Sequence, residues 1–203
     1  MKIESNAWNR LRYSMWAPVY DLAGRRFDRY RRESLARLQL RDGERLLLVG
    51  AGTGDDLPYV PTGVRTVATD LTPAMLERAR PKSTVAHLAV MDGHRLAVKA
   101  DAFDAAALHL ILAVIPDPAA CLRETARAVR PCGRIVVFDK FVRGTRVPFA
   151  LRVLNVFTRV LATEITRRFE DILERSGAPL VVEEDTPASL QGLFRYIVLR
   201  RTR

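Results

Sequence analysis

The central part of the chain carries short runs of apolar residues, separated by glycine, proline and charged residues. The runs at 46–49, 64–69, 103–114 and 134–138 contain few polar positions, which is typical of strands buried on both faces of a sheet. Segment 122–129 has the apolar spacing of a helix. Strands that alternate with helices in this way predict an α/β protein with a mostly parallel sheet.

The first strand runs into a glycine-rich turn, and the second ends in a carboxylate. Asp70 stands 20 residues after Gly50, the first glycine of the turn. Neighbouring parallel strands bring their carboxyl ends to one crevice, where nucleotides bind. Glycine lets the backbone approach a ligand at places where a Cβ atom would clash. A carboxylate at the end of the second strand accepts hydrogen bonds from two ribose hydroxyls, so the pattern predicts a nucleotide site.

The spacing of the glycines indicates which nucleotide. A dinucleotide site has G-x-G-x-x-G, with the pyrophosphate at the helix N-terminus. Here the turn reads G-x-G-x-G, and Asp55 stands where that pattern has its third glycine. Asp55 and Asp56 are expected to open a following helix, where acids suit the helix dipole but repel a pyrophosphate. A cofactor with a ribose and no phosphate fits better.

These motifs resemble those of the class I S-adenosylmethionine-dependent methyltransferases. The resemblance covers residues 8–142 well and 163–200 loosely. It implies a Rossmann-like, seven-stranded, mostly parallel sheet with helices on both faces, an N-terminal helical arm and an antiparallel C-terminal edge. The last helix is expected at 163–176, with Gly177 as its C-cap. The last two strands are expected at 180–184 and 194–199.

The resemblance also implies S-adenosylmethionine as cofactor and a set of residues that bind it. Asp70 would hold the ribose, Asp92 would accept from the adenine amino group, and the end of the fourth strand would lie beside the methionine part. Many relatives carry an acid where this chain has Leu48, so backbone carbonyls around Gly50 and His109 are expected to meet the cofactor's ammonium. The predicted cofactor-binding residues are Tyr20, Gly50, Ala51, Gly52, Thr53, Gly54, Asp70, Leu71, Met75, Met91, Asp92, Gly93, His109 and Leu110.

Composition fits one domain over residues 1–203. With 48% hydrophobic and 28% charged residues, the chain has the make-up of a globular protein. We expect a cytoplasmic protein, because no apolar signal core or membrane-spanning run is present. The two cysteines and three histidines show no metal-ligand spacing, so no metal is expected.

The net charge of +10 is placed unevenly. Residues 1–41, a predicted helical arm, carry 10 basic and 4 acidic side chains, and residues 143–168, a predicted cap, carry 6 and 1. The cofactor-binding core at 42–142 balances with 12 of each, and residues 169–203 hold 5 and 6. Clustered positive charge attracts anionic partners such as a lipid surface, nucleic acid or an acidic metabolite.

The two basic segments have recognisable character. Residues 16–21, Trp-Ala-Pro-Val-Tyr-Asp, resemble a segment of quinone C-methyltransferases and bacterial phosphatidylethanolamine N-methyltransferases. That resemblance makes Tyr13 and Tyr20 candidates to flank the methyl group. Residues 147–162 form a strongly apolar stretch with Arg152 and Arg159 on one face, which suits a membrane surface, a lid or a core-packed helix.

Methyl transfer requires alignment and, for some nucleophiles, removal of a proton. His109, at the end of the fourth strand, is the best candidate base because imidazole titrates near neutral pH, although it could instead form the cofactor wall through its backbone. Asp139 and Lys140 end the fifth strand and are expected at the same mouth.

Three functions remain open from the sequence. The first is N-methylation of a phospholipid amine by a protein attached peripherally to the inner membrane face. The second is O-, N- or C-methylation of a small molecule of quinone or secondary metabolism. The third is a catalytically silent nucleic-acid-binding protein, which ranks last because no nucleic-acid-binding motif is present. The sequence does not specify an oligomeric state.

Overall fold

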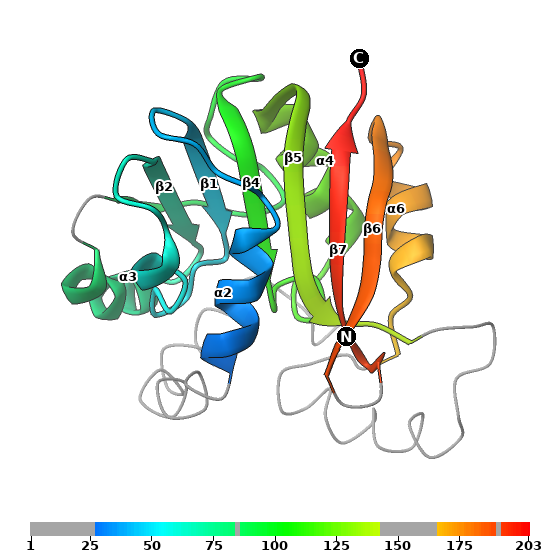
Figure 1. Ribbon diagram of the computed structural model, residues 1–203, viewed down its shortest axis with the longest axis horizontal. Helices are drawn as coiled ribbons and strands as arrows, with labels where there is room; N and C mark the ends of the chain where they lie inside the picture. Colours follow the sequence, from blue (N-terminus) through cyan, green and yellow to red (C-terminus); the bar gives the residue numbers. More distant parts are fainter. Residues whose placement is uncertain (1–26, 84–85, 143–165, 190–191) are drawn as a thin grey trace, which may run out of the picture.

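The computed structural model describes residues 27–83, 86–142, 166–189 and 192–203, which form one seven-stranded sheet with helices on both faces (Figure 1). The strand order is β3-β2-β1-β4-β5-β7-β6. Neighbours from β3 to β5 run parallel, and β7 runs antiparallel to both β5 and β6. The strands are β1 Arg45–Val49, β2 Arg65–Asp70, β3 His87–Val90, β4 Phe103–His109, β5 Val129–Lys140, β6 Leu180–Ser189 and β7 Phe194–Arg201. The predicted Rossmann-like α/β architecture is confirmed.

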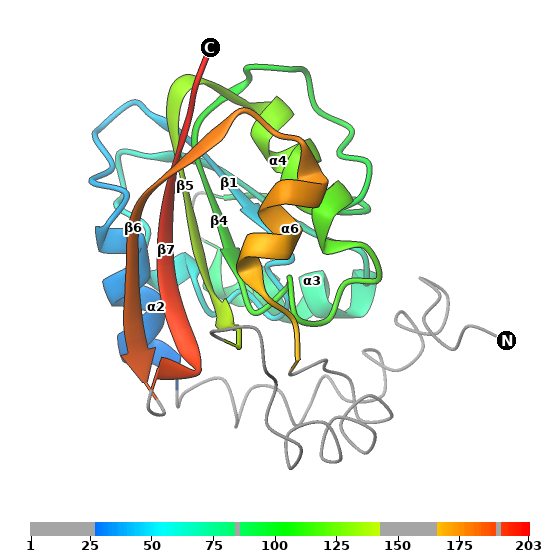
Figure 2. The same ribbon diagram turned by 90° about the vertical axis from the view of Figure 1, so that its right-hand side faces the viewer.

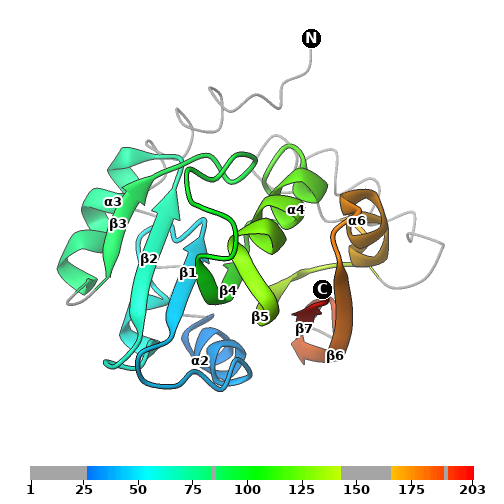
Figure 3. The ribbon, with the colours of Figure 1, turned by 90° about the horizontal axis from the view of Figure 1, so that it is seen from above.

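Helices cover the sheet from two sides, as Figures 2 and 3 show: α2 lies on one face, and α4 and α6 lie on the other. The helices are α2 Asp28–Ala36, α3 Pro73–Ala79, α4 Pro118–Ala128 and α6 Phe169–Ser176, with short 3-10 helices η2 Leu57–Tyr59 and η3 Arg80–Lys82. Asp117 caps α4 by accepting from the backbone N–H groups of Ala119 and Ala120, and Pro118 takes the first helical position. The predicted C-cap Gly177 of α6 adopts the left-handed conformation, with φ of 57°.

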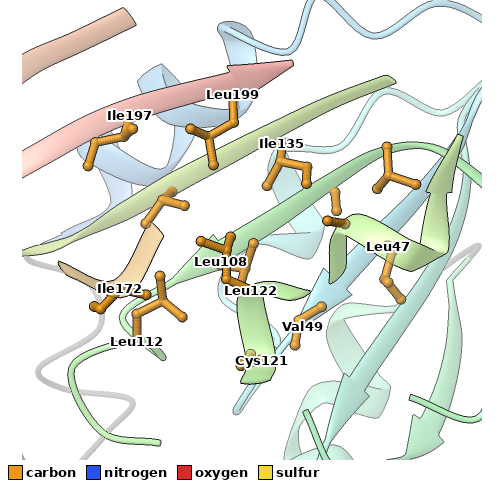
Figure 4. Close-up of a cluster of buried hydrophobic side chains, with 14 of the residues drawn as sticks. Leu47, Val49, Leu108, Leu112, Cys121, Leu122, Ile135, Ile172, Ile197 and Leu199 are labelled. Carbon is orange, nitrogen blue, oxygen red and sulfur yellow. The ribbon is translucent and has the colours of Figure 1, made fainter. Parts of the chain in front are cut away.

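Side chains of the central strands alternate between two cores. Leu47 and Val49 of β1 point to the α4 and α6 side. There they belong to the same buried cluster as Leu108, Leu122 and Ile172 (Figure 4). The intervening Leu46 and Leu48 belong to the other core, which includes Leu35 and Leu38 beside α2. Both cores are needed because a parallel sheet is stable only when both of its faces are covered. Burial of the Cys121 thiol in the first core raises its pKa to about 12, so this thiol stays protonated.

The segment after the glycine turn differs from the prediction. A helix beginning at Asp55 and Asp56 is expected from the sequence, yet only η2 forms there. Pro61 follows η2 closely, and in a longer helix it would remove a backbone N–H donor and clash with the preceding turn. The two acids therefore do not serve a helix dipole, and each is held by an ion pair instead.

Strand boundaries also differ: the strands predicted at 180–184 and 194–199 run on to Ser189 and Arg201, and β4 and β5 depart from the prediction as well. The fourth strand ends at His109 rather than continuing to Val114, because Leu110 adopts a φ of +58° and its N–H turns to the carbonyl of Phe138. Residues 130–133, predicted as a turn before the fifth strand, form an irregular stretch inside β5, where the register with β4 shifts. Predicted helix 122–129 corresponds to α4, which begins earlier, at its Pro118.

Several expectations lie outside the described residues. These are the positions of Tyr13 and Tyr20 in the basic arm, and the conformation of segment 147–162. No helix within the described ranges is long and apolar enough to cross a membrane. The division of the chain into arm, core, cap and C-terminal part stays a prediction.

Candidate functional site

A cavity lies at the carboxyl ends of β1, β2 and β4, beside the beginning of α2. Its wall contains the glycine turn, the end of β2, the loop after β3 and the loop after β4. The lining residues are Phe27, Arg31, Gly50, Ala51, Gly52, Thr53, Asp55, Asp70, Leu71, Thr72, Met75, Met91, Asp92, Gly93, His109, Leu110, Ile111, Val114, Ile115 and Pro116. The structure thus brings the predicted cofactor residues together, with the exception of Gly54 and of Tyr20, which lies outside the described residues.

Gly52 and Gly54 of the turn have different structural roles. Gly52 has φ of +55°, and a Cβ atom placed there would meet nothing within 4 Å, so its open side faces the cavity. Gly54 has φ of +80°, and a Cβ there would come within 2.8 Å of the Ala79 side chain of α3. Gly54 therefore allows α3 to pack closely against the turn, and it does not line the cavity.

Asp70 is held in place by the backbone around it. One carboxylate oxygen accepts from the N–H of Gly52 at 2.9 Å, and the other from the N–H of Thr72 at 2.8 Å. Burial raises the pKa of Asp70, and these two backbone hydrogen bonds oppose the rise. The carboxylate thus links the end of β2 to the glycine turn at the wall of the cavity.

Asp92 lines the cavity from the loop after β3, and a histidine orients it. Its Oδ1 lies 2.7 Å from Nδ1 of His94, and Nε2 of that ring accepts from the backbone N–H of Asp117 at 3.0 Å. Because Nε2 is an acceptor, Nδ1 carries the hydrogen and donates it to Asp92. His94 thus joins the predicted adenine acceptor to the beginning of α4.

His109 lies at the end of β4 with its side chain fully buried. Nδ1 is 2.7 Å from a carboxylate oxygen of Asp56, and Nε2 is 2.9 Å from the Ser34 hydroxyl on α2. Since the carboxylate only accepts, Nδ1 carries the hydrogen and donates it to Asp56, and Nε2 pairs with the Ser34 hydroxyl. Both ring nitrogens therefore have protein partners, and neither is directed to a substrate proton.

Asp56 is the centre of this buried polar cluster. Its two oxygens accept from one terminal nitrogen of Arg31, at 3.0 Å each. Burial alone would raise the pKa of Asp56, but the charge of Arg31 and the contact with His109 outweigh it and hold the pKa well below its usual range. The carboxylate is ionised and pairs α2 with the glycine turn.

Asp139 does not line the cavity. Its carboxylate is fully buried, with Oδ2 accepting from the N–H of Ala113 at 2.9 Å and Oδ1 accepting from the N–H of Lys140 at 2.8 Å. Burial raises the pKa of Asp139. This residue holds the loop after β4, whose Ile111 and Val114 form the apolar wall of the cavity. The structure thus places Asp139 behind the site rather than at its mouth.

Two lining residues at the beginning of α2, Phe27 and Arg31, were not predicted from the sequence. The Phe27 ring packs against Phe138 and Phe194, with ring centroids 5.9 Å and 5.2 Å away. Arg31 is one of several arginines between 25 and 41, and nothing in the local sequence distinguishes it. Its partner Asp56 is 25 positions away, so only the packing of α2 on the core identifies it.

The described residues contain no group of three or more histidine, cysteine or acidic side chains that could hold a metal ion. What the cavity offers is the carboxylates of Asp70 and Asp92, an open glycine turn and one apolar wall. This arrangement suits a cofactor made of a nucleoside and an amino acid.

Comparison with known proteins agrees with this geometry. Residues 47–137 match the family model described as methyltransferase domain. The chain is 31% identical over 198 residues to phosphatidylethanolamine N-methyltransferase from Cereibacter sphaeroides, covering 93% of this chain and 95% of that protein. It is also 31% identical over 137 residues to demethylmenaquinone methyltransferase from Streptomyces griseus subsp. griseus, covering 67% of this chain and 57% of that protein.

Solved structures show the same fold at low sequence identity. A chain of the complex between the Haloferax volcanii Trm112 methyltransferase activator and its methyltransferase superposes with a TM-score of 0.75 at 18% identity, covering 94% of this chain and 98% of that one. A methyltransferase from Thermotoga maritima superposes with a TM-score of 0.71 at 16% identity, covering 94% and 99%.

Proposed function

The chain belongs to the S-adenosylmethionine-dependent methyltransferases, and we propose that it methylates the amine of a phospholipid of the phosphatidylethanolamine type at a membrane surface. The bound cofactor supplies a methyl group on a sulfonium, which a nucleophile displaces in line. Asp70 holds the ribose, Asp92 accepts from the adenine amino group, and Gly52 lets the backbone approach the cofactor.

The observation that carries the choice of an amine is the environment of His109. Both of its ring nitrogens are engaged, by Asp56 and by Ser34, inside a buried cluster. A phenol or a ring carbon benefits from a side chain that removes a proton, whereas a neutral amine attacks with its own lone pair. The acids that line the described cavity, Asp55, Asp70 and Asp92, are also held by donors of the protein. The chain's contribution is therefore alignment and exclusion of water.

A lipid as the carrier of that amine is supported by two further observations. The Cereibacter relative is matched over nearly the whole chain, including the basic segments outside the core. In addition, Leu110, Ile111, Val114 and Ile115 give the cavity an apolar wall, which suits a substrate with hydrocarbon attached.

A small quinone precursor is the second candidate substrate. The Streptomyces relative has the same identity over two thirds of the chain. An aromatic group beside the cavity favours it: Phe27 lines the wall, and Tyr30 stacks on Phe138 with ring centroids 5.9 Å apart. A flat ring could pack against this group, and its methylation at carbon or oxygen would require a base that His109 does not supply.

The test is a transfer assay with methyl-labelled cofactor, offering phosphatidylethanolamine vesicles in one arm and a demethylmenaquinone in the other. With saturating cofactor we expect label in the lipid fraction, with turnover lost in Asp70→Ala and retained within about threefold in His109→Gln. Label in the quinone arm alone would overturn the proposal, as would a hundredfold loss in a folded His109→Gln variant, which would show that a base is needed.

A further inference from the structure

Arg31 of α2 lines the cavity, and the described residues use only part of its hydrogen-bonding capacity. The residue is only 9% exposed, and its guanidinium lines the cavity together with Gly50, Gly52 and Thr53. One terminal nitrogen binds both oxygens of Asp56, at 3.0 Å each. Nε is buried without a partner, and among the described residues no hydrogen-bond partner is found for the second terminal nitrogen. Arg31 therefore keeps hydrogen-bonding capacity directed at the cavity surface.

Three side chains, from three places in the fold, set the position of this guanidinium. Asp56 binds Arg31 on one side and the His109 ring on the other, at 2.7 Å. The far side of that ring meets Ser34, which lies three residues after Arg31 and so on the same face of α2. Arg31 and Ser34 of α2 thus bind the two ends of the Asp56–His109 pair: Arg31 contacts Asp56, and Ser34 contacts His109. The guanidinium cannot turn away from the cavity without breaking this buried cluster.

The charges around the cavity show what this position is suited to bind. Among the described lining residues, the acids are Asp55, Asp70 and Asp92, and Arg31 is the single permanent cation. The cofactor has two positive groups, its sulfonium and its ammonium, and one negative group, its carboxylate. The acids suit the former two, and an arginine with spare donors suits a carboxylate.

We infer that Arg31 binds the carboxylate at the amino-acid end of the cofactor, and that Asp56, His109 and Ser34 are positioning residues for it. This inference rests on the proposed methyltransferase function. It gives His109 a role that needs no proton transfer. It also gives α2, the part of the N-terminal arm that the structure describes, a direct part in holding the cofactor.

The test is calorimetry with two probes, S-adenosylmethionine and decarboxylated S-adenosylmethionine, which lacks only the carboxylate. The wild-type protein should prefer the former by about tenfold to a hundredfold, as expected for a hydrogen bond to a charged group. Arg31→Gln should lose most of that preference by weakening the first probe and leaving the second nearly unchanged. The matched control is Arg32→Gln, since Arg32 is the exposed neighbour on the same helix and should behave as wild type.

Positioning by the cluster is tested with the same two probes. Ser34→Ala and His109→Gln should each reduce the preference severalfold, because the guanidinium loses its support, and should leave the affinity for the decarboxylated probe intact. If Arg31→Gln does not fold because Asp56 is left buried and unpaired, the double variant Arg31→Gln/Asp56→Asn removes both charges and takes its place.

A wild-type protein that binds both probes equally would overturn the inference and leave the proposed function standing. The inference would also fall if Arg31→Gln kept the wild-type preference. A wild-type protein that bound neither probe would contradict the proposed function itself.

Discussion

Nδ1 of His94 lies 2.7 Å from Oδ1 of Asp92 and donates to it, while the other ring nitrogen is fixed by the N–H of Asp117. The predicted adenine acceptor is therefore oriented by a neighbour only two positions along the chain. A carboxylate that is pre-aimed loses less freedom when a ligand binds, so the histidine contributes to cofactor affinity without touching the cofactor.

From this arrangement we expect His94→Phe to weaken cofactor binding by ~1–3 kcal/mol, because Asp92 loses a donor and the N–H of Asp117 loses its acceptor. Calorimetry with S-adenosylhomocysteine measures the loss. His87→Phe serves as the control, since His87 is exposed on the edge strand β3. Equal affinities of His94→Phe and wild type would remove the positioning role.

The buried Asp56 makes stability depend on pH in a defined direction. Its pKa in the folded protein is below the usual value, about 3.9 for an unfolded chain. The ionised carboxylate therefore adds stability that is complete above the unfolded pKa and is lost as the pH falls toward the folded pKa. Urea unfolding of wild type and Asp56→Asn should show a stability difference that is largest near neutral pH and shrinks below about pH 4. Parallel pH curves for the two proteins would contradict this.

Asp139 shows the opposite electrostatic situation. Burial raises its pKa, so the folded protein favours the protonated form, and ionisation lowers stability as the pH rises. In Asp139→Asn the buried charge is removed and the N–H of Lys140 loses its acceptor, while an oxygen remains for the N–H of Ala113, so stability at neutral pH should change little. Asp139→Ala leaves that N–H unpaired and should cost ~1–3 kcal/mol. Thermal unfolding compares the pair. A large loss of stability in Asp139→Asn would show that the charge itself is needed.

The charge partition along the sequence predicts attachment to an anionic membrane surface. The segments 1–41 and 143–168 carry net charges of +6 and +5 against a neutral core. Each basic residue near an anionic surface contributes ~1 kcal/mol, which salt weakens. Sedimentation with vesicles should therefore increase with anionic lipid and decrease with ionic strength. Reversing Arg25, Arg26, Arg152 and Arg159 to glutamate should abolish it and leave cofactor affinity intact. A protein that ignored anionic vesicles at low salt would instead favour the small-molecule reading.

The parts of the site that depend on short-range patterns were predictable from the sequence. The strand before the glycine turn and the carboxylate that ends the next strand are both local signals, and parallel pairing of β1 with β2 places Gly52 within 2.9 Å of Asp70. The fold followed from the same alternation of strands and helices, because buried parallel strands need helical connections.

The parts that depend on long-range packing could not be predicted in this way. Gly54 looks like a ligand-binding glycine, yet it makes room for Ala79 of α3. Asp139 looks like a residue at the mouth, yet the loop after β4 folds over it, with Ala113 donating to its carboxylate. The roles of Arg31 and His109 depend on the docking of α2, which no local pattern specifies.

The most direct test of the proposed reaction is to locate the transferred methyl group. Turnover with cofactor labelled with carbon-13 at the methyl group, followed by carbon NMR of the product, identifies the atom that carries the label. We expect a single labelled N-methyl resonance from the ethanolamine headgroup of the lipid. Wild type and His109→Gln should both form this product, at rates within about threefold of each other. A label on a ring carbon or on a phenolic oxygen would contradict it.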